Sequence, residues 1–399
     1  MTSTLRQRRH QRIHHQPGQR LGQRTVSQRL GAQAGRIGLV AGLSALSVAS
    51  SLAQAQTPVP APAQTATASQ SSASSTSSKA TSDSNSIQLY GLIGIYADSL
   101  KRSDMSSSLK QVGSGGLTTS FWGVRGKDDL GQGTSAVFTL ESFFQPDNGN
   151  QGRSTKDGAW ARNAYVGLSN SQWGAVTLGR QTNPTYLAMQ QVNPYGSSVV
   201  FSPLVLQTFV SSYGGAIVGD TVWDNTIKYQ SPKVGGFSGS VIYGLGEVAG
   251  QDGVANLGLH MVYDQQGFTA VVSMQRNRTA VVAPATEQTT WLGGVAYDLN
   301  WAKLYGAYAR VHSEGSELTN HTWSLGASVP VTAQGAVLVD WAHTDSQAGA
   351  AAQTDRSTVT AGYDYTLSRR TNVYAVYSWD KLTGHDSGNT YGVGIRHTF

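Results

Sequence analysis

Six histidines follow residue 56, and they are the side chains with which the chain could carry out acid–base chemistry. His343 lies nearest to acids, because Asp340 and Asp345 stand within three residues of it, as a hydrolytic dyad would need. The alternative interpretation is a surface histidine beside solvated acids, which is the commoner arrangement. The chain contains neither a GxSxG nucleophile motif nor an HExxH zinc motif. We therefore predict that the protein is not an enzyme and has no cofactor and no metal site.

The composition excludes several classes of protein. The chain has 399 residues, no cysteine, 13% charged residues and a formal net charge of +6. The absence of cysteine excludes a disulfide scaffold and thiol chemistry. Residues 1–56 carry eight arginines and no acid, so the remainder has 29 − 8 = 21 bases against 23 acids, a net charge of −2. The positive charge therefore belongs to the N-terminal segment, and we expect no nucleic-acid partner.

The first 85 residues are typical of an exported protein. An arginine-rich start precedes an apolar stretch at 37–52, and Ala53-Gln54-Ala55 then offers the small residues that signal peptidase accepts. We interpret 1–55 as a signal peptide, with a downstream start codon and a twin-arginine signal at Arg8-Arg9 as open alternatives. Residues 56–85, rich in Ser, Thr, Ala and Pro, are predicted to form a disordered linker. Binding of the cell wall or a periplasmic partner by this linker is the alternative.

From Ser86 onward, apolar and polar residues alternate with a period of two, which is typical of strands. In the last segment Tyr391, Val393, Ile395 and Phe399 share one face with His397. Short turns and longer polar loops alternate between the segments, as in the meander of an outer-membrane barrel. The sixteen candidate strands are 86–98, 116–126, 134–145, 159–169, 174–182, 222–231, 236–245, 254–263, 267–277, 288–298, 302–311, 321–329, 335–343, 356–366, 372–380 and 388–399.

A membrane-crossing sheet must close on itself, because hydrocarbon offers its backbone no hydrogen-bond partner. We therefore predict an all-β fold, a 16-stranded antiparallel transmembrane β-barrel over 86–399, with a lumen wide enough for water. A soluble propeller or sandwich is the alternative, but a propeller would show a blade repeat that the sequence lacks. Aromatic residues near the predicted strand ends suit interfacial girdles: Trp160, Tyr165, Trp173, Trp291, Tyr297, Trp301 and Phe399.

Several ordered motifs are similar to those of a known family. They are IQLYGLIGIY at the start of the barrel, FWGVRGKDDLGQGTSAVFTLES around the first turn, ARNAYVGLSNSQWGAVTLGRQ before the long loop, and NTIKYQSPKVGGFSGSVIYGLGEVAG after it. With these motifs, residues 86–399 resemble the Gram-negative general porins, especially the betaproteobacterial type. The terminal YGVGIRHTF resembles the signal that the barrel-assembly machinery reads, with Phe399 as its aromatic residue.

The resemblance implies a homotrimer in the cell outer membrane, surrounded by lipid and lipopolysaccharide, in which each subunit has its own pore. It also implies a third external loop that folds into the lumen. Asn183 to Thr221 is the longest connection and follows the fifth predicted strand, where that loop is expected. A loop exposed outside the barrel is the alternative. The apolar stretch from Phe201 to Val210 favours burial against the barrel wall.

The family places acids on this loop opposite bases on the wall, and the present chain departs from that pattern. Between 183 and 221 the single charged residue is Asp220, and the aromatic residues are Tyr186, Tyr195, Phe201, Phe209 and Tyr213. The predicted wall residues are Arg162, Arg180, Lys228, Arg396, Arg125 and Glu141, with Leu92 and Phe121 where related porins often carry bases. Glu141 is expected to face inward and to pair with a base.

We expect each arginine either to enter the path of the solute or to tether the loop or the subunit interface. For Arg180, the parity that it shares with Val176 and Leu178 favours the interface. The predicted function is passive diffusion of small hydrophilic solutes and ions through a weakly charge-selective pore lined by aromatic and amide groups. The alternative is a surface adhesin or structural barrel with a closed lumen.

Overall fold

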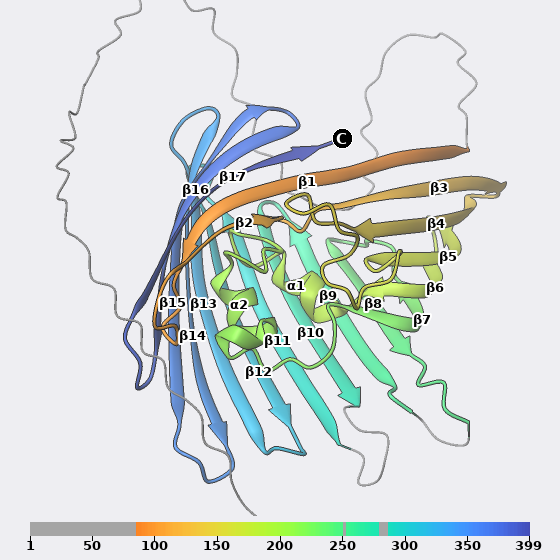
Figure 1. Ribbon diagram of the computed structural model, residues 1–399. Coiled ribbons are helices and arrows are strands. Elements are labelled where there is room, and N and C mark those ends of the chain that lie inside the picture. The colour runs from red at the N-terminus through yellow and green to blue at the C-terminus, as the bar shows by residue number, and fades with distance from the viewer. Residues whose placement is uncertain (1–84, 250–252, 279–285) are drawn as a thin grey trace, which may run out of the picture. The chain divides into compact units, whose positions relative to one another are not determined.

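The computed structural model describes residues 85–249, 253–278 and 286–399 (Figure 1). The signal peptide predicted for 1–55 lies outside these residues, as does the linker predicted for 56–85 except for its last residue. The strands are β1 Ser86–Leu100, β2 Leu109–Ser114, β3 Phe121–Gly131, β4 Thr134–Phe143, β5 Asn163–Asn170, β6 Gly174–Thr182, β7 Val222–Gln230, β8 Phe237–Gly244, β9 Asn256–Gln265, β10 Phe268–Arg278, β11 Glu287–Asp298, β12 Lys303–Ser313, β13 Leu318–Pro330, β14 Gly335–Ala348, β15 Thr354–Ser368, β16 Thr371–Leu382 and β17 Gly388–Thr398. Between β6 and β7 lie helices α1 Pro184–Met189 and α2 Pro203–Phe209 and the 3₁₀ turn η1 Ser211–Tyr213.

The strands form one closed antiparallel sheet. Each strand from β3 to β17 pairs with the next one along the chain, and β1 pairs with β17. β2 and β3 pair with the two halves of β1, so that together they are one interrupted strand. The interruption follows from Gly115 and Gly116, whose φ angles of 90° and 83° are incompatible with a strand. The 16-stranded barrel predicted from the sequence is therefore confirmed.

The connections differ in length at the two ends of the barrel. One end, called the turn end below, has tight turns such as that between β9 and β10, where Gln266 and Gly267 have φ angles of 53° and 80°. Positive φ at both central residues is the requirement of the two-residue turn whose twist matches the strands. The other end, called the loop end, carries the longer connections, including 183–221. Phe399 lies at the turn end, where its backbone exchanges hydrogen bonds with Gly91.

Side chains alternate between the two faces of the sheet as the pattern predicted. On β17, Tyr391 and Val393 point outward and are 60% and 58% exposed, while Thr390 points inward and is buried. Trp291 and Tyr297 likewise lie on the outer face of β11, where they are 48% and 47% exposed. The predicted position of Tyr165 in an interfacial girdle is wrong, because its register opposite Thr139 places it on the inward face. No helix in the described ranges has the length and apolar character that crossing a membrane would require.

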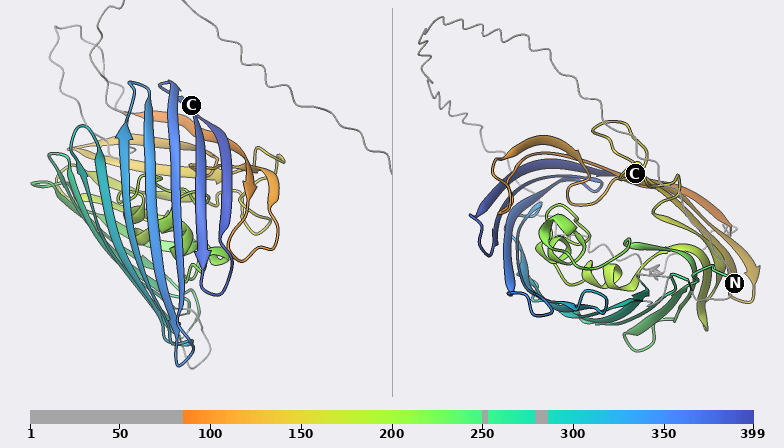
Figure 2. Two further views of the ribbon diagram at one scale, coloured as in Figure 1. Left: turned by 90° about the vertical axis from the view of Figure 1, so that its left-hand side faces the viewer. Right: turned by 60° about the horizontal axis from the view of Figure 1, so that its bottom comes forward.

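The 183–221 segment is compact, and Figure 2 shows its helices inside the ring of strands. α1 contacts β9, β10 and β11, and α2 contacts β13, β14 and β15. Each helix starts with a capping residue followed by proline at the first position: Asn183 accepts a hydrogen bond from the Tyr186 amide at 2.8 Å, and Ser202 accepts one from the Val205 amide. The long connection expected over 183–221 therefore contains two helices, and the Asn183-Pro184 and Ser202-Pro203 pairs are a recognisable signal for their starts.

Candidate pore constriction

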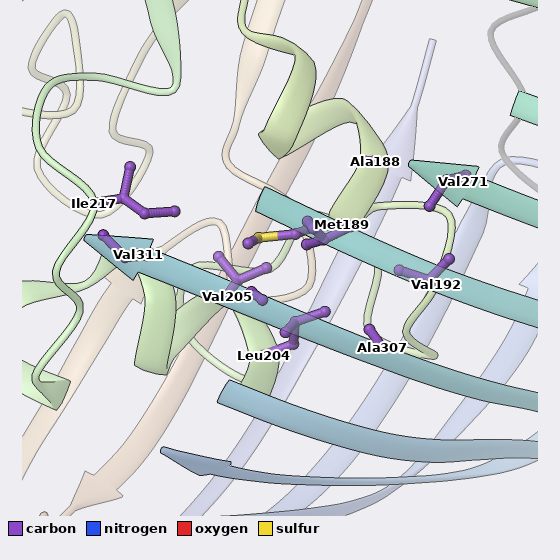
Figure 3. Packing of buried hydrophobic residues seen from close by; sticks show 11 residues of the cluster. Ala188, Met189, Val192, Leu204, Val205, Ile217, Val271, Ala307 and Val311 are labelled. Carbon is purple, nitrogen blue, oxygen red and sulfur yellow. The ribbon is translucent and has the colours of Figure 1, made fainter. Parts of the chain in front are cut away.

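The inward face of β10, β11 and β12 is apolar in its middle, which is unexpected for the lining of a water-filled lumen. The 183–221 segment explains this, because it covers that part of the wall (Figure 3). The contact removes apolar side chains of both partners from water, and each fully buried one contributes about 1.5–3 kcal/mol. The buried cluster comprises Ala188, Met189, Val192, Leu204, Val205 and Ile217 from the segment and Val271, Leu292, Ala307, Ala309 and Val311 from the wall.

A second set of contacts holds the middle of the segment to the inner face of β1, β14 and β16. Phe201, 1% exposed, packs edge-on between Tyr96 of β1 and Tyr374 of β16, with ring centroids 5.4 and 6.0 Å away. Tyr195, 3% exposed, donates its hydroxyl hydrogen to the Leu338 carbonyl at 3.1 Å. The segment is therefore fixed to the wall from β9 round to β1.

The predicted lining of the gap by aromatic loop residues is wrong for Tyr195, Phe201 and Tyr213. Each is at most 8% exposed, because it is packed against the wall. Tyr186 and Phe209 are half-buried and stack edge-on against each other at 5.5 Å. The apolar character of these residues stabilises the packing of the segment against the wall. The alternation pattern of the strands carries no information about that packing.

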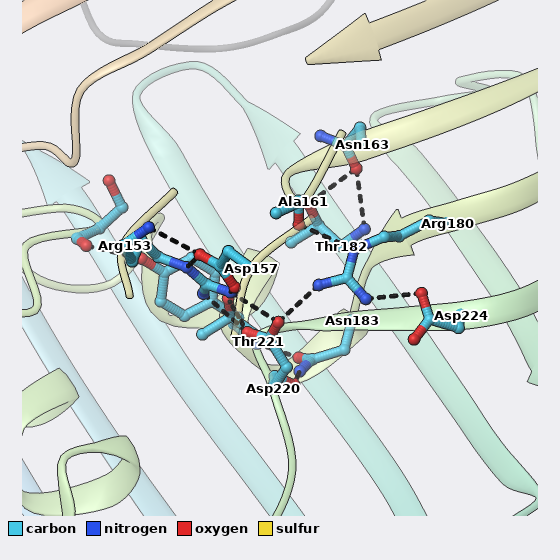
Figure 4. Close-up of polar contacts among 12 residues, drawn as sticks. Arg153, Asp157, Ala161, Asn163, Arg180, Thr182, Asn183, Asp220, Thr221 and Asp224 are labelled. Carbon is cyan, nitrogen blue, oxygen red and sulfur yellow. Dashed lines mark hydrogen bonds and ion pairs between the residues drawn. The ribbon is translucent and has the colours of Figure 1, made fainter. Parts of the chain in front are cut away.

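The two ends of the segment meet at a network of ion pairs (Figure 4). Asp220 accepts two hydrogen bonds of 2.8 Å from the Arg153 guanidinium and one of 2.6 Å from Arg180. Arg153 also binds Asp157, and Arg180 binds Asp224 at 2.6 Å. Because Arg153 belongs to the 143–163 loop and Arg180 to β6, the network joins three parts of the chain.

The network shifts the pKa values of its acids. Hydrogen bonds from Arg153 hold the pKa of Asp157 below its ordinary value, although partial burial opposes them. Burial alone would raise the pKa of Asp220, but the hydrogen bonds and charges of Arg153 and Arg180 outweigh it and lower that pKa. Both acids are therefore ionised at neutral pH, and the charge of Asp220 is compensated within the network.

Arg180 has the placement that parity indicated. Val176 and Leu178, on the same face of β6, are 40% and 52% exposed and point outward. The Arg180 side chain reaches the rim at the loop end, where its Nε donates to the Ala161 carbonyl at 2.8 Å. Within one subunit, Arg180 thus ties the exit of the 183–221 segment to the wall.

Arg162 and Glu141 form an ion pair on the β3–β5 wall. Glu141 is 4% exposed and also accepts hydrogen bonds from the Tyr90 hydroxyl at 2.6 Å and from the Asn163 amide. The Arg162 guanidinium lies 3.9 Å from the centre of the Phe121 ring, in cation–π geometry. Glu141 faces inward, as expected, and its pairing neutralises the charge of Arg162.

The other predicted wall residues also face inward. Arg125 donates to the Gln88 side chain at 2.8 Å and lies over the Tyr90 ring, and Leu92 is 3% exposed. Lys228 shares the inward face of β7 with Thr226 and Gln230. Arg396 donates to Asn372 at 3.0 Å and lies 3.9 Å from the nearest oxygen of Asp364. Among the described residues, Arg125 and Lys228 form no ion pair.

One cluster at the loop end was missed in the sequence. Arg356 forms two hydrogen bonds with Asp380, at 2.9 and 2.6 Å, and its guanidinium lies 4.7 Å from the centre of the Tyr213 ring. Arg102 approaches the same ring at 5.7 Å. These residues pin η1 to β15, β16 and the loop after β1. Their inward parity on the strands was visible in the sequence, but the position of η1 was not.

The histidine candidate assembles only in part, because His343 contacts Asp345 but not Asp340. Asp340 faces inward and is 0% exposed, whereas His343 lies on the outward face of β14 and binds Ser357 at 2.7 Å and Asp345 at 3.0 Å. Two residues of a strand that are separated by an odd number of positions, such as 340 and 343, point to opposite faces. In the described part of the chain, no group of three or more His, Cys, Asp or Glu residues could hold a metal ion.

Comparison with known proteins agrees with this architecture. Residues 42–385 match the family described as Gram-negative porin. The chain is 28% identical over 326 residues to an outer membrane porin protein of Bordetella pertussis, covering 70% of this chain and 82% of the relative. It is 27% identical over 341 residues to outer membrane porin protein 32 of Delftia acidovorans, covering 79% and 94%. An anion-selective porin from Comamonas acidovorans superposes with a TM-score of 0.68 at 26% identity, covering 79% of this chain and all of that one. The chain belongs to the Gram-negative porin family, whose members form passive diffusion channels in the outer membrane.

Proposed function

We propose that the chain forms a water-filled channel whose narrowest part lies between the 183–221 segment and the β3–β8 wall, and that this channel weakly favours anions. The observation that carries the proposal is the charge balance of that wall. Arg162 is neutralised by Glu141, whereas Arg125 and Lys228 face inward without an ion-pair partner in the part of the chain that the structure describes. A similar porin from Comamonas acidovorans is described as anion-selective.

The preference is expected to be weak because the segment itself offers almost no opposing charge. Asp220 is its one charged residue, and two arginines compensate it. A strong transverse field needs uncompensated charges on both sides of a narrow gap. Small hydrophilic solutes and ions are the class of substrate that such a channel admits. We assign no catalytic role to the chain.

We also propose a homotrimer, by resemblance to the general porins. The outer faces of β1, β5 and β6 support it with exposed apolar side chains: Ile87, Leu89, Val166, Leu168, Val176 and Leu178. Lipid would cover the remaining outer surface. The C-terminal aromatic Phe399 would serve as the recognition element for the barrel-assembly machinery during insertion.

Conductance in a planar bilayer tests the channel directly. Purified, refolded protein should produce discrete steps, often in threes, and a salt gradient should give a small reversal potential of the sign expected for anions. A reversal potential of the opposite sign would overturn the anion preference. The absence of steps from a demonstrably folded barrel would favour the alternative, a surface-binding or structural barrel whose lumen is closed by the 183–221 segment.

A further inference from the structure

Five glycines of the barrel wall lie in direct contact with the 183–221 segment, and we call them the contact glycines. They stand on β9, β11, β13, β15 and β17, in the same order in which the segment crosses these strands. The pairs of contact glycine and segment residue are Gly258 with Pro184, Gly294 with Val192, Gly326 with Pro194, Gly362 with Tyr195 and Gly392 with Phe201.

The backbone conformation does not require glycine at these positions. None of these five described residues has a positive φ angle, and each lies in the regular register of its two neighbouring strands. Glycine in the interior of a strand weakens it, and it commonly marks a bulge or a place where another part of the chain approaches closely. Because the register is regular, close approach of the segment is the reason that remains.

The space at these contacts is too small for a methyl group. A Cβ atom on Gly294 would lie 2.8 Å from the Cγ2 atom of Val192, and one on Gly326 would lie 2.6 Å from the Cδ atom of Pro194. Carbon atoms in contact are ordinarily about 3.5–4.0 Å apart, so each methyl group would need about 1 Å of additional room. A proline ring and a β-branched valine have little rotational freedom with which to provide it. The backbone of the segment or of the wall would therefore have to move.

The wall is the stiffer of the two partners. Gly294 stands opposite Val271 on β10 and Ala307 on β12, so its strand is paired on both sides within a closed sheet. Val271 and Ala307 belong to the same buried cluster as Val192 (Figure 3). The segment, by contrast, lies inside the ring of strands (Figure 2). A methyl group on the inward face of β11 would therefore push the segment toward the lumen.

We propose that the contact glycines, above all Gly294 and Gly326, set how closely the segment approaches the wall and thereby the width of the channel. This inference rests on the proposed function, because it requires the segment to border the narrowest part of the channel. The glycines are positioning residues that act through the segment. They determine the largest hydrophilic solute that passes, since pore diameter is a main determinant of selectivity. Adding one methyl group narrows the channel and changes no charge.

The first test compares Gly294→Ala with Gly293→Ala in the refolded full-length protein. Gly293 is the matched control, because it precedes Gly294 and stands opposite the outward residue Val272. Apart from its chain neighbours, no atom of the described residues lies within 4 Å of the position that a Cβ atom on Gly293 would take. Gly294→Ala should lower the single-channel conductance and slow the uptake of a disaccharide into liposomes, relative to a monosaccharide, by roughly twofold or more. Gly293→Ala should match the unmodified protein in both measurements.

The second test uses Gly326 and Pro194 as a reciprocal pair. Gly326→Ala should lower the conductance and the uptake ratio as Gly294→Ala does, and it also serves if Gly294→Ala does not fold. Pro194→Ala removes the two ring atoms that lie 2.6 and 3.0 Å from the added Cβ atom. The double variant should therefore return both values toward those of the unmodified protein, and Pro194→Ala alone should change them little. Such coupling measures the contact itself, whereas a general loss of stability would add in the double variant.

Unchanged conductance and uptake ratio in Gly294→Ala and Gly326→Ala would overturn the proposal. A larger or noisier conductance would also overturn it, because the methyl group would then detach the segment from the wall. A crystal structure of Gly294→Ala should show the backbone of Val192 displaced toward the lumen by about 1 Å. The absence of channel steps from the unmodified protein would contradict the proposed function instead, and the crystal structure would still test the position of the segment.

Discussion

Asp220 and Arg180 lie 2.6 Å apart between carboxylate and guanidinium, at the point where the 183–221 segment leaves the lumen and β7 begins. The same carboxylate also accepts two hydrogen bonds from Arg153. A single acid therefore holds the exit of the segment to β6 and to the 143–163 loop.

Replacing this acid should loosen the segment without unfolding the barrel. We expect Asp220→Asn to reduce local stability by about 1.5–3 kcal/mol, the range for hydrogen bonds to charged groups. The change should appear as faster hydrogen exchange in 183–221 and as more current noise in single-channel records. Asp224→Asn is the control, because Asp224 is 66% exposed at its side chain and binds Arg180 alone. Equal noise in the two variants would contradict the tethering role of Asp220.

The pH dependence of the tether follows from the lowered pKa values of Asp157 and Asp220. A carboxyl whose folded pKa is below its unfolded value contributes stability above the unfolded value, and that stability is lost as pH falls through the folded pKa. Channel noise should therefore stay constant from neutral pH down to the ordinary aspartate pKa of about 4 and rise only in stronger acid. A rise already at pH 6 would mean that other groups control the segment.

Lys228 should set much of the ion preference. Removing its charge with Lys228→Gln should shift the reversal potential toward cations, since a unit charge about 4 Å away contributes about 1 kcal/mol in water, or up to roughly fivefold in local anion concentration. Lys233→Gln makes the same chemical change in the turn after β7, where Lys233 pairs with Asp264, and should have a smaller effect. An unchanged reversal potential in Lys228→Gln would remove Lys228 from the constriction.

Arg162 and Glu141 should behave as a coupled pair. Arg162→Gln leaves the buried Glu141 carboxylate without its cation, so we expect a loss of roughly 1–3 kcal/mol in unfolding free energy and a shift toward cation preference. The double change Arg162→Gln with Glu141→Gln should recover part of the stability and return the reversal potential near its original value. Urea titration of the refolded barrel and a double-mutant cycle measure the coupling. Additive effects would show that the pair is not coupled.

Phe201 should be the main anchor of the middle of the segment. Phe201→Ala removes a ring packed between Tyr96 and Tyr374 and should cost roughly 3–5 kcal/mol locally. We expect brief closures or a changed conductance, because the segment can then leave its seat. Phe201→Leu keeps most of the buried apolar surface and should behave more like the original protein. Identical single-channel records for Phe201→Ala and the unmodified chain would disprove the anchoring role.

The barrel itself was predictable because its signal is local. Alternation with a period of two decides which side chains share a face, so Lys228, Glu141 and Leu92 could be placed inward from their neighbours in the sequence. The ion pair of Glu141 with Arg162 within one subunit could also be predicted from the sequence, because the two residues lie at the paired ends of neighbouring strands. The interruption between β2 and β3 was not foreseen, although Gly115 and Gly116 mark it.

The position of the 183–221 segment against the barrel wall was decided by the tertiary structure alone. The sequence indicated a long apolar loop, but the partners of that loop are distant: Arg153 and Asp220 are separated by 67 positions, and Arg356 and Ser212 by 144. Closure of the barrel brings these side chains together, and no periodicity within a single strand encodes that closure. The sequence by itself therefore determined the sheet, its faces and its membrane setting. Three-dimensional packing determined which aromatic residues are buried and which charges remain free to meet a solute.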